Sequence, residues 1–244
     1  MTDRDIIDRR SVYQWSTVAR TLDPAAHALR RDEFVDVAQR LIQSRGYEQM
    51  SVQDVLDELG ASKGAFYHYF DSKEALLTAV IERMTDGALA MLAPMVADPA
   101  IPAPEKFEGV FSGIARFKNA RKELLLAIIQ TWISDDNAIV REKFRRATVK
   151  RLAPLMATIV EQGLAEGTFS ASPPEPVARV LVSLMLGANE AAVDLFVAHQ
   201  ANAITFETVQ STLTAYADAF GRILGAPTGS FRITDEATLR LWFD

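Results

Sequence analysis

The segment Ser62–Phe70 reads Ser-Lys-Gly-Ala-Phe-Tyr-His-Tyr-Phe, and it is rich in groups that can bind phosphate oxygens or the edges of bases. The rings of Phe, Tyr and His fill its last five positions, and Lys63 is its only cation. Tyrosine hydroxyls, serine hydroxyls and backbone amides at helix starts can bind phosphate without carrying charge. The segment can therefore contact a polyanion even though the formal net charge of the chain is -6.

Other kinds of site have no matching pattern in the sequence. There is no glycine-rich phosphate loop, no Gly-X-Ser-X-Gly elbow and no cysteine nucleophile. The three histidines, at 27, 68 and 199, are too scattered for a zinc site, and without cysteine no thiolate site exists. We therefore expect no metal, no cofactor and no catalytic activity.

The composition is that of a globular protein. Of the 244 residues, 49% are hydrophobic and 24% are charged, which is close to the usual averages. No apolar run approaches the roughly 18 residues that span a bilayer, and the start Met-Thr-Asp-Arg-Asp lacks the features of a secretory signal. We expect a cytoplasmic protein without a membrane segment.

The elements around Ser62–Phe70 are predicted to be helices. Residues 30–45 carry apolar side chains at helical spacing, and Gly46 follows them. A capping box at Ser51-Val-Gln-Asp predicts a second short helix, Ser62 can cap a third, and Asp71-Ser-Lys-Glu predicts the cap of a fourth that continues through Met84. Phe66 and Phe70 share one face of the third helix and are expected to be buried.

Further helices are predicted beyond the prolines at 99, 102 and 104. Apolar spacing resumes at Phe107, and the later candidates are 124–133, 139–166, 176–199 and 206–224, with a short terminal helix at 235–242. Pro154 should kink the longest of them or split it in two. Since no period-two alternation is sustained, the predicted fold is all-α.

Two short helices joined by Gly60-Ala-Ser-Lys describe a helix-turn-helix, in which the second helix enters the major groove of DNA. Many three-helix units with such a turn bind nothing, so geometry alone leaves DNA binding open. The residues from Gly46 to Leu77, with the Gly-Ala-Ser-Lys-Gly turn, the aromatic helix and the Ser-Lys-Glu cap in one register, resemble the amino-terminal domain of the TetR family of transcriptional regulators. The resemblance covers residues 31 to about 84 and beyond that only helix number and length.

This resemblance implies a set of DNA contacts. Ser51, Tyr67 and Tyr69 would bind phosphates, as His68 could, and Lys73 would reach the DNA backbone. Gln53, Lys63, Gly64 and Ala65 match positions that approach base edges, although the family commonly has a hydroxyl where this chain has Ala65. Two alternatives stay open, since Tyr69 can be half-buried packing and Lys73 can simply be solvated.

For the rest of the chain, the resemblance implies a larger helical bundle that dimerises through 176–199 and 206–224 and encloses a small-molecule pocket. Candidate pocket residues are Phe107, Phe111, Phe117, Trp132, Met156, Met185 and Asn189, each of which could instead belong to an ordinary core. The predicted domains are an N-terminal extension (1–29), a helix-turn-helix domain (30–76), a ligand-binding and dimerisation domain (77–227) and a C-terminal tail (228–244).

Two regions allow several interpretations. Residues 116–151 hold ten basic groups against four acidic ones, which indicates a solvated face, a face that pairs with acidic helices, or an entrance for anionic ligands. Residues 1–29 can form a helix packed on the DNA-binding domain, a disordered tail or an arginine arm in the minor groove.

The function predicted from the sequence is that of a homodimeric repressor that a small molecule of unknown identity releases from a palindromic operator. The alternatives are a regulator of the same fold that responds to a protein partner, and an activator.

Overall fold

The computed structural model describes residues 23–134, 137–227 and 229–243. Within these ranges every regular element is a helix, which confirms the predicted all-α fold. Residues 1–22 of the predicted N-terminal extension (1–29) lie outside the described part of the chain. The helices are α1 (Pro24–Arg45), α2 (Val52–Leu59), α3 (Lys63–Tyr69), α4 (Lys73–Ala97), α5 (Ala103–Asn119), α6 (Lys122–Ile133), α7 (Ala138–Glu166), α8 (Pro174–Gln200), α9 (Phe206–Leu224) and α10 (Glu236–Phe243).

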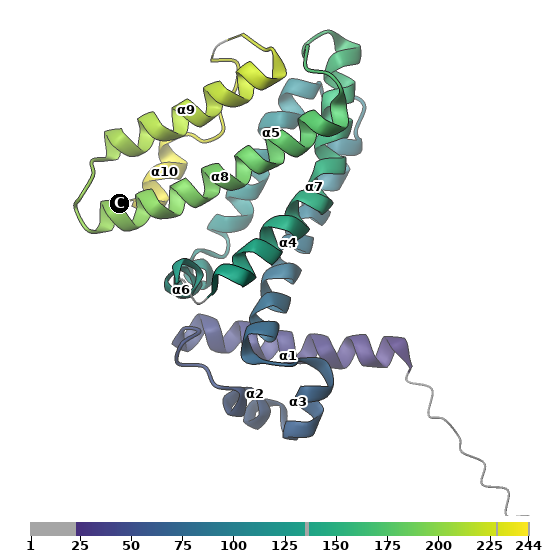
Figure 1. The fold of residues 1–244 in the computed structure, drawn as a ribbon, viewed down its shortest axis with the longest axis vertical. Coiled ribbons are helices and arrows are strands. Elements are labelled where there is room, and N and C mark those ends of the chain that lie inside the picture. Colours follow the sequence, from purple (N-terminus) through teal and green to yellow (C-terminus); the bar gives the residue numbers. More distant parts are fainter. Residues whose placement is uncertain (1–22, 135–136, 228, 244) are drawn as a thin grey trace, which may run out of the picture.

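Helices α1, α2 and α3 form one end of the molecule, and α4 leads from them into the larger bundle (Figure 1). Phe34 and Leu41 of α1, Val55 of α2 and Phe66 of α3 are buried together in a first core with the early part of α4. The same core includes Leu124 and Ile128 of α6. The small helical unit is therefore packed directly against the larger one.

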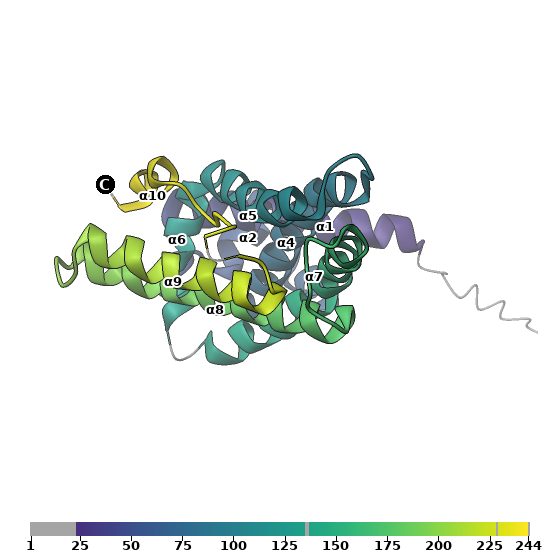
Figure 2. The same ribbon diagram turned by 90° about the horizontal axis from the view of Figure 1, so that it is seen from above.

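A second core lies in the bundle between the far half of α4 and helices α5, α7, α8 and α9. Phe107, Met156, Leu181 and Phe220 are fully buried there, each from a different helix. Helix α8 packs along both α7 and α9, and Figure 2 shows α8 and α9 side by side.

The segment after α9 turns back onto this bundle. Phe231 packs on Phe107 with 4.8 Å between ring centroids. The indole of Trp242 donates to Oδ1 of Asn119 at 2.6 Å, and Phe243 packs against Phe196. The short terminal helix predicted at 235–242 is confirmed as α10, and its contacts dock it on α5 and α8.

Three local expectations differ from the structure. The cap of α4 is Ser72, whose hydroxyl accepts from the backbone N–H of Ala75, rather than Asp71. Helix α1 begins at Pro24, because Asp23 accepts from the N–H of Ala25 and a proline needs no N–H partner in the first turn. The predicted boundary at residue 29 thus falls inside α1, as the boundary at 76 falls inside α4.

Pro154 does not split α7, which runs as one helix from Ala138 to Glu166. A proline removes one backbone hydrogen bond and crowds the preceding turn. Here α4, α5 and α8 all pack on α7, and Leu152, Ala153 and Met156 beside the proline are buried. The burial of α7 against three other helices therefore stabilises it by more than the lost backbone hydrogen bond at Pro154 destabilises it.

Candidate nucleic-acid interface

Side-chain caps fix the turn between α2 and α3. The hydroxyl of Ser51 accepts from the N–H of Asp54 at 3.1 Å, and the Asp54 carboxylate accepts from the N–H of Ser51 at 2.8 Å, which is a capping box. The hydrogen bonds from the Ser51 hydroxyl and amide lower the pKa of Asp54. Gly60 ends α2 with φ of 58°, a left-handed conformation that favours glycine, and Ser62 then caps α3.

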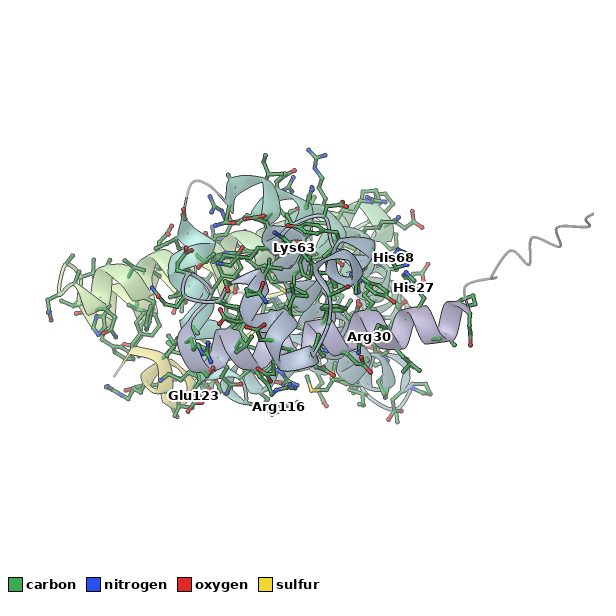
Figure 3. All side chains as sticks on the ribbon, turned by 90° about the horizontal axis from the view of Figure 1, so that it is seen from below. His27, Arg30, Lys63, His68, Arg116 and Glu123 are labelled. Carbon is green, nitrogen blue, oxygen red and sulfur yellow. The ribbon has the colours of Figure 1, made fainter. Side chains whose placement is uncertain are left out.

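Helix α3 is held by its two phenylalanines and exposes its other side. Phe66 and Phe70 are buried in the first core, as predicted. Lys63, Gly64 and His68 are exposed, and Tyr67 keeps 52% of its surface exposed. Figure 3 shows Lys63 and His68 on the face seen from the α2–α3 end of the molecule. Of the predicted contact residues of α3, Lys63, Gly64, Tyr67 and His68 are thus exposed, on a helix whose other side is buried.

The last turn of α3 also contacts the start of α1. The ring of His27 lies 5.3 Å from that of His68 and 4.6 Å from that of Tyr69, centroid to centroid. Tyr69 is half-buried and also packs on Phe34 at 5.6 Å. Tyr69 therefore contributes packing, and its predicted phosphate contact stays a prediction.

The remaining predicted DNA contacts also have partners within the chain. Gln53 is exposed and donates to Asp57 at 2.7 Å. The Lys73 ammonium lies 4.2 Å from the centroid of the Tyr47 ring and donates to the carbonyl of Glu48 at 3.4 Å. Ala65 is half-buried, with its N–H bonded to Ser62. In the described structure Lys73 joins the start of α4 to the turn between α1 and α2.

The structure distributes the predicted pocket residues over three places. Phe107, Phe111, Met156 and Met185 belong to the second core or pack against it, whereas Trp132 lies against the first core and Phe144. Phe117 lies under the guanidinium of Arg121, 3.7 Å from it. Asn189 accepts a hydrogen bond from the Lys118 ammonium. Two hollows on the molecule are lined by other residues, one of about 210 Å³ between α9 and the C-terminal segment and one of about 20 Å³ between α4 and α7.

Three basic side chains of the segment 116–151, namely Arg145, Arg146 and Arg151, form ion pairs in the described structure. Glu142 binds both Arg145 and Arg146, which lowers its pKa to about 2, and Arg151 pairs with Asp86 of α4 at 2.7 Å. The pairs with Glu142 lie within α7, so only the pair of Arg151 with Asp86 matches a face that pairs with acidic helices.

The sequence analysis does not include His27 in the site. His27 lies outside the predicted helix-turn-helix domain (30–76), although Asp23-Pro24 is a recognisable helix start and His27 and Phe34 are two turns apart.

Comparison with known proteins agrees with this geometry. Residues 34–80 match the model of the bacterial regulatory proteins of the tetR family. The transcriptional repressor KstR2 of Mycolicibacterium smegmatis is 26% identical over 147 residues, which are 60% of this chain and 70% of the relative. The transcriptional regulator EthR of Mycobacterium tuberculosis is 28% identical over 172 residues, which cover 61% of this chain and 80% of the relative.

Solved structures show the same fold. A TetR transcription regulator from Haloarcula marismortui has a TM-score of 0.56 at 22% identity, over 79% of this chain and 98% of that one. RolR in complex with resorcinol has a TM-score of 0.58 at 18% identity, over 83% and 91%. A helix-turn-helix that exposes Lys63, Tyr67 and His68 coincides with the family match over residues 34–80, and together with the related repressors it supports a DNA-binding transcriptional regulator of the TetR type.

Proposed function

We propose that the protein is a homodimeric repressor that binds a palindromic operator and leaves it when a small molecule binds the larger domain. The observation that carries this proposal is the outward face of α3, fixed by Phe66 and Phe70 beneath it. The predicted DNA-binding domain (30–76) would be extended to the start of α1 at Pro24, and the helices that follow, through residue 227, would form the effector-binding and dimerisation domain. The protein would act in the cytoplasm and catalyse no reaction.

The contacts proposed for DNA are those of the exposed side of α3 and the start of α2. Lys63, with Gln53 of α2, would reach base edges, and Tyr67 and His68 would bind phosphates. The Ser51 hydroxyl lies at a helix start, where backbone N–H groups favour an anion. Few cations take part, so few counterions would be released and the salt dependence would be modest.

Dimerisation is supported by the exposed apolar surface of α8. Most of the apolar part of this helix is not buried within the described chain, and Val180 is 53% exposed. By length and composition α8 could cross a membrane, but Leu181 and Val182 pack it into the second core, and α7 and α9 lie along it. A Cβ on Gly187 would meet no atom within 4 Å, so a second helix can approach there.

A second copy of the chain packed on α8 would cover this apolar surface. A homodimer is also needed to read a palindromic operator, because each recognition helix reads only one half-site. Twofold symmetry would place them about 34–36 Å apart, one turn of DNA. The relatives lend support for repression and for an effector, since KstR2 is named a repressor and RolR is seen with resorcinol.

Selection of bound fragments from the source genome by the purified protein tests the proposal. We expect a short inverted repeat whose half-sites are centred about one helical turn, or a multiple of it, apart. Analytical ultracentrifugation of the complex should then show an even number of protomers. Fragments without sequence in common, or an asymmetric site bound by a monomer, would contradict the proposal.

A further inference from the structure

The first and second cores are separated by a layer with few buried apolar side chains. No residue of α4 between Ile81 and Leu92 is buried, and none of α5 after Gly113. On α7, no residue between Val140 and Thr148 is buried. The layer thus includes parts of three helices, α4, α5 and α7.

Contacts between the helices show that these segments lie at the same level along the bundle. A Cβ on Gly87 of α4 would lie 3.4 Å from the ring of Phe117 on α5. The neighbouring residue Lys118 donates to Asn189 of α8. Asp86, beside Gly87, pairs with Arg151 of α7. Positions 86–87, 117–118, 151 and 189 therefore lie close to one another across the bundle.

Lys118 stands out in this layer because its side chain is half-buried between α5 and α8 and no carboxylate of the described residues pairs with its ammonium. Its one hydrogen bond within the described residues is to the neutral amide of Asn189. Burial lowers the pKa of Lys118 to about 8, and no neighbouring carboxylate counteracts that effect. A buried cation is normally paired, since leaving it unpaired is strongly unfavourable.

Thr148 is a second polar group at the same height with an unmet hydrogen bond. Its hydroxyl is buried and finds no partner in the described part of the chain. It lies one turn from Arg151, which pairs with Asp86. On its other side lies Arg145, whose pKa is raised by Glu142 and, more weakly, by Glu190, the neighbour of Asn189.

We propose that this layer binds the effector and that Lys118 pairs with a carboxylate on an otherwise apolar small molecule. The inference rests on the proposed function, because it names the chemical class of that effector. The oxygen of Asn189 already accepts from Lys118, so its amide group can donate to the second carboxylate oxygen. One ammonium with one amide suits a monoanion, whereas a phosphate dianion would call for more cations.

The half-buried rings and aliphatic side chains around the layer suit the apolar remainder of such a molecule. Phe117 lies beside Lys118, and Leu89, Phe111, Ile114 and Met185 pack against the second core from the same region. Binding there would push on α4, which carries the helix-turn-helix at its other end (Figure 1). An effector in this layer can thus change the spacing of the two recognition helices.

The probes are octanoate and 3-phenylpropanoate, with their neutral amides and octyl phosphate as comparisons. Binding is measured by calorimetry and thermal shift with the full chain, with Lys118→Met, and with Arg116→Met as a matched control. Arg116 lies on the same helix but is exposed, and its guanidinium donates to the hydroxyl of Ser112. We expect at least one carboxylate to bind the wild type and the control equally, and Lys118→Met at least tenfold more weakly.

The proposal is overturned if neither carboxylate binds, if the amides bind as well, if octyl phosphate binds more tightly, or if Lys118→Met binds without loss. Operator binding is measured separately, without any probe. A wild type that binds its operator while failing the probe test loses only this inference. A wild type that binds no operator loses the proposed function instead.

Discussion

Replacing Lys118 by methionine should stabilise the protein, although it removes a hydrogen bond between α5 and α8. Burial lowers the pKa of Lys118 from 10.5 to about 8. At about 1.4 kcal/mol for each tenfold change in the protonation equilibrium, this difference corresponds to roughly 3 kcal/mol as an upper limit at neutral pH. Methionine has a similar length and no charge, while Asn189 loses a partner worth about 1 kcal/mol. We expect a net gain of about 1–2 kcal/mol.

The gain should depend on pH in a definite direction. Below pH 8 the lysine is charged in both the folded and the unfolded state, so the full penalty is present. Between pH 8 and 10.5 the folded state loses the proton first, and the stability of the wild type rises toward that of the variant. Urea unfolding of both proteins at pH 7 and pH 9.5 measures this difference in free energy.

A matched control is available at Lys106, which is 2% exposed but has two hydrogen bonds, to the carbonyl of Val96 at 2.7 Å and to Gln162 at 2.6 Å. Lys106→Met should be destabilising, by roughly 1–3 kcal/mol, because it leaves both acceptors without their donor. The reasoning is refuted if Lys118→Met is less stable than the wild type at pH 7, or if its advantage does not shrink by pH 9.5.

Three further predictions concern the DNA-binding unit and the dimer. Ser51→Ala removes the cap of α2 and should lower the free energy of unfolding by about 1 kcal/mol, measured in urea; an unchanged midpoint would contradict the role of the capping box. Lys63→Ala should reduce discrimination at one base pair of each half-site by about 1–3 kcal/mol while the dimer still binds, as fluorescence anisotropy with single-base variants would show. A uniform loss over all sequences would assign Lys63 to phosphate instead. Val180→Glu should weaken the dimer at least a hundredfold, about 3 kcal/mol, and with it operator binding, whereas Leu29→Glu, at another exposed apolar residue, should leave sedimentation unchanged. Equal behaviour of the two variants would place the interface elsewhere.

The sequence determined the helix-turn-helix and most helix positions, because the signals involved are local. Ser51 and Ser62 cap the helices that follow them, Gly60 supplies a left-handed turn, and the i, i+4 pair Phe66 and Phe70 marks the buried side of α3. Each signal depends on residues within about one turn of one another, so it can be read from the chain alone. The same periodicity predicted that the later helices exist but not which faces meet.

Only the tertiary structure decided how the helices share their side chains. The candidate pocket residues all have apolar or amide side chains. In the structure, however, Trp132 packs against the first core, Phe107 belongs to the second, and Asn189 of α8 accepts a hydrogen bond from Lys118 of α5. His27 contacts α3 from about 40 residues away in the chain, and Lys118 became significant only when burial left its charge without a partner. Burial and charge pairing depend on which distant helices come together, and spacing along a single helix does not contain that information.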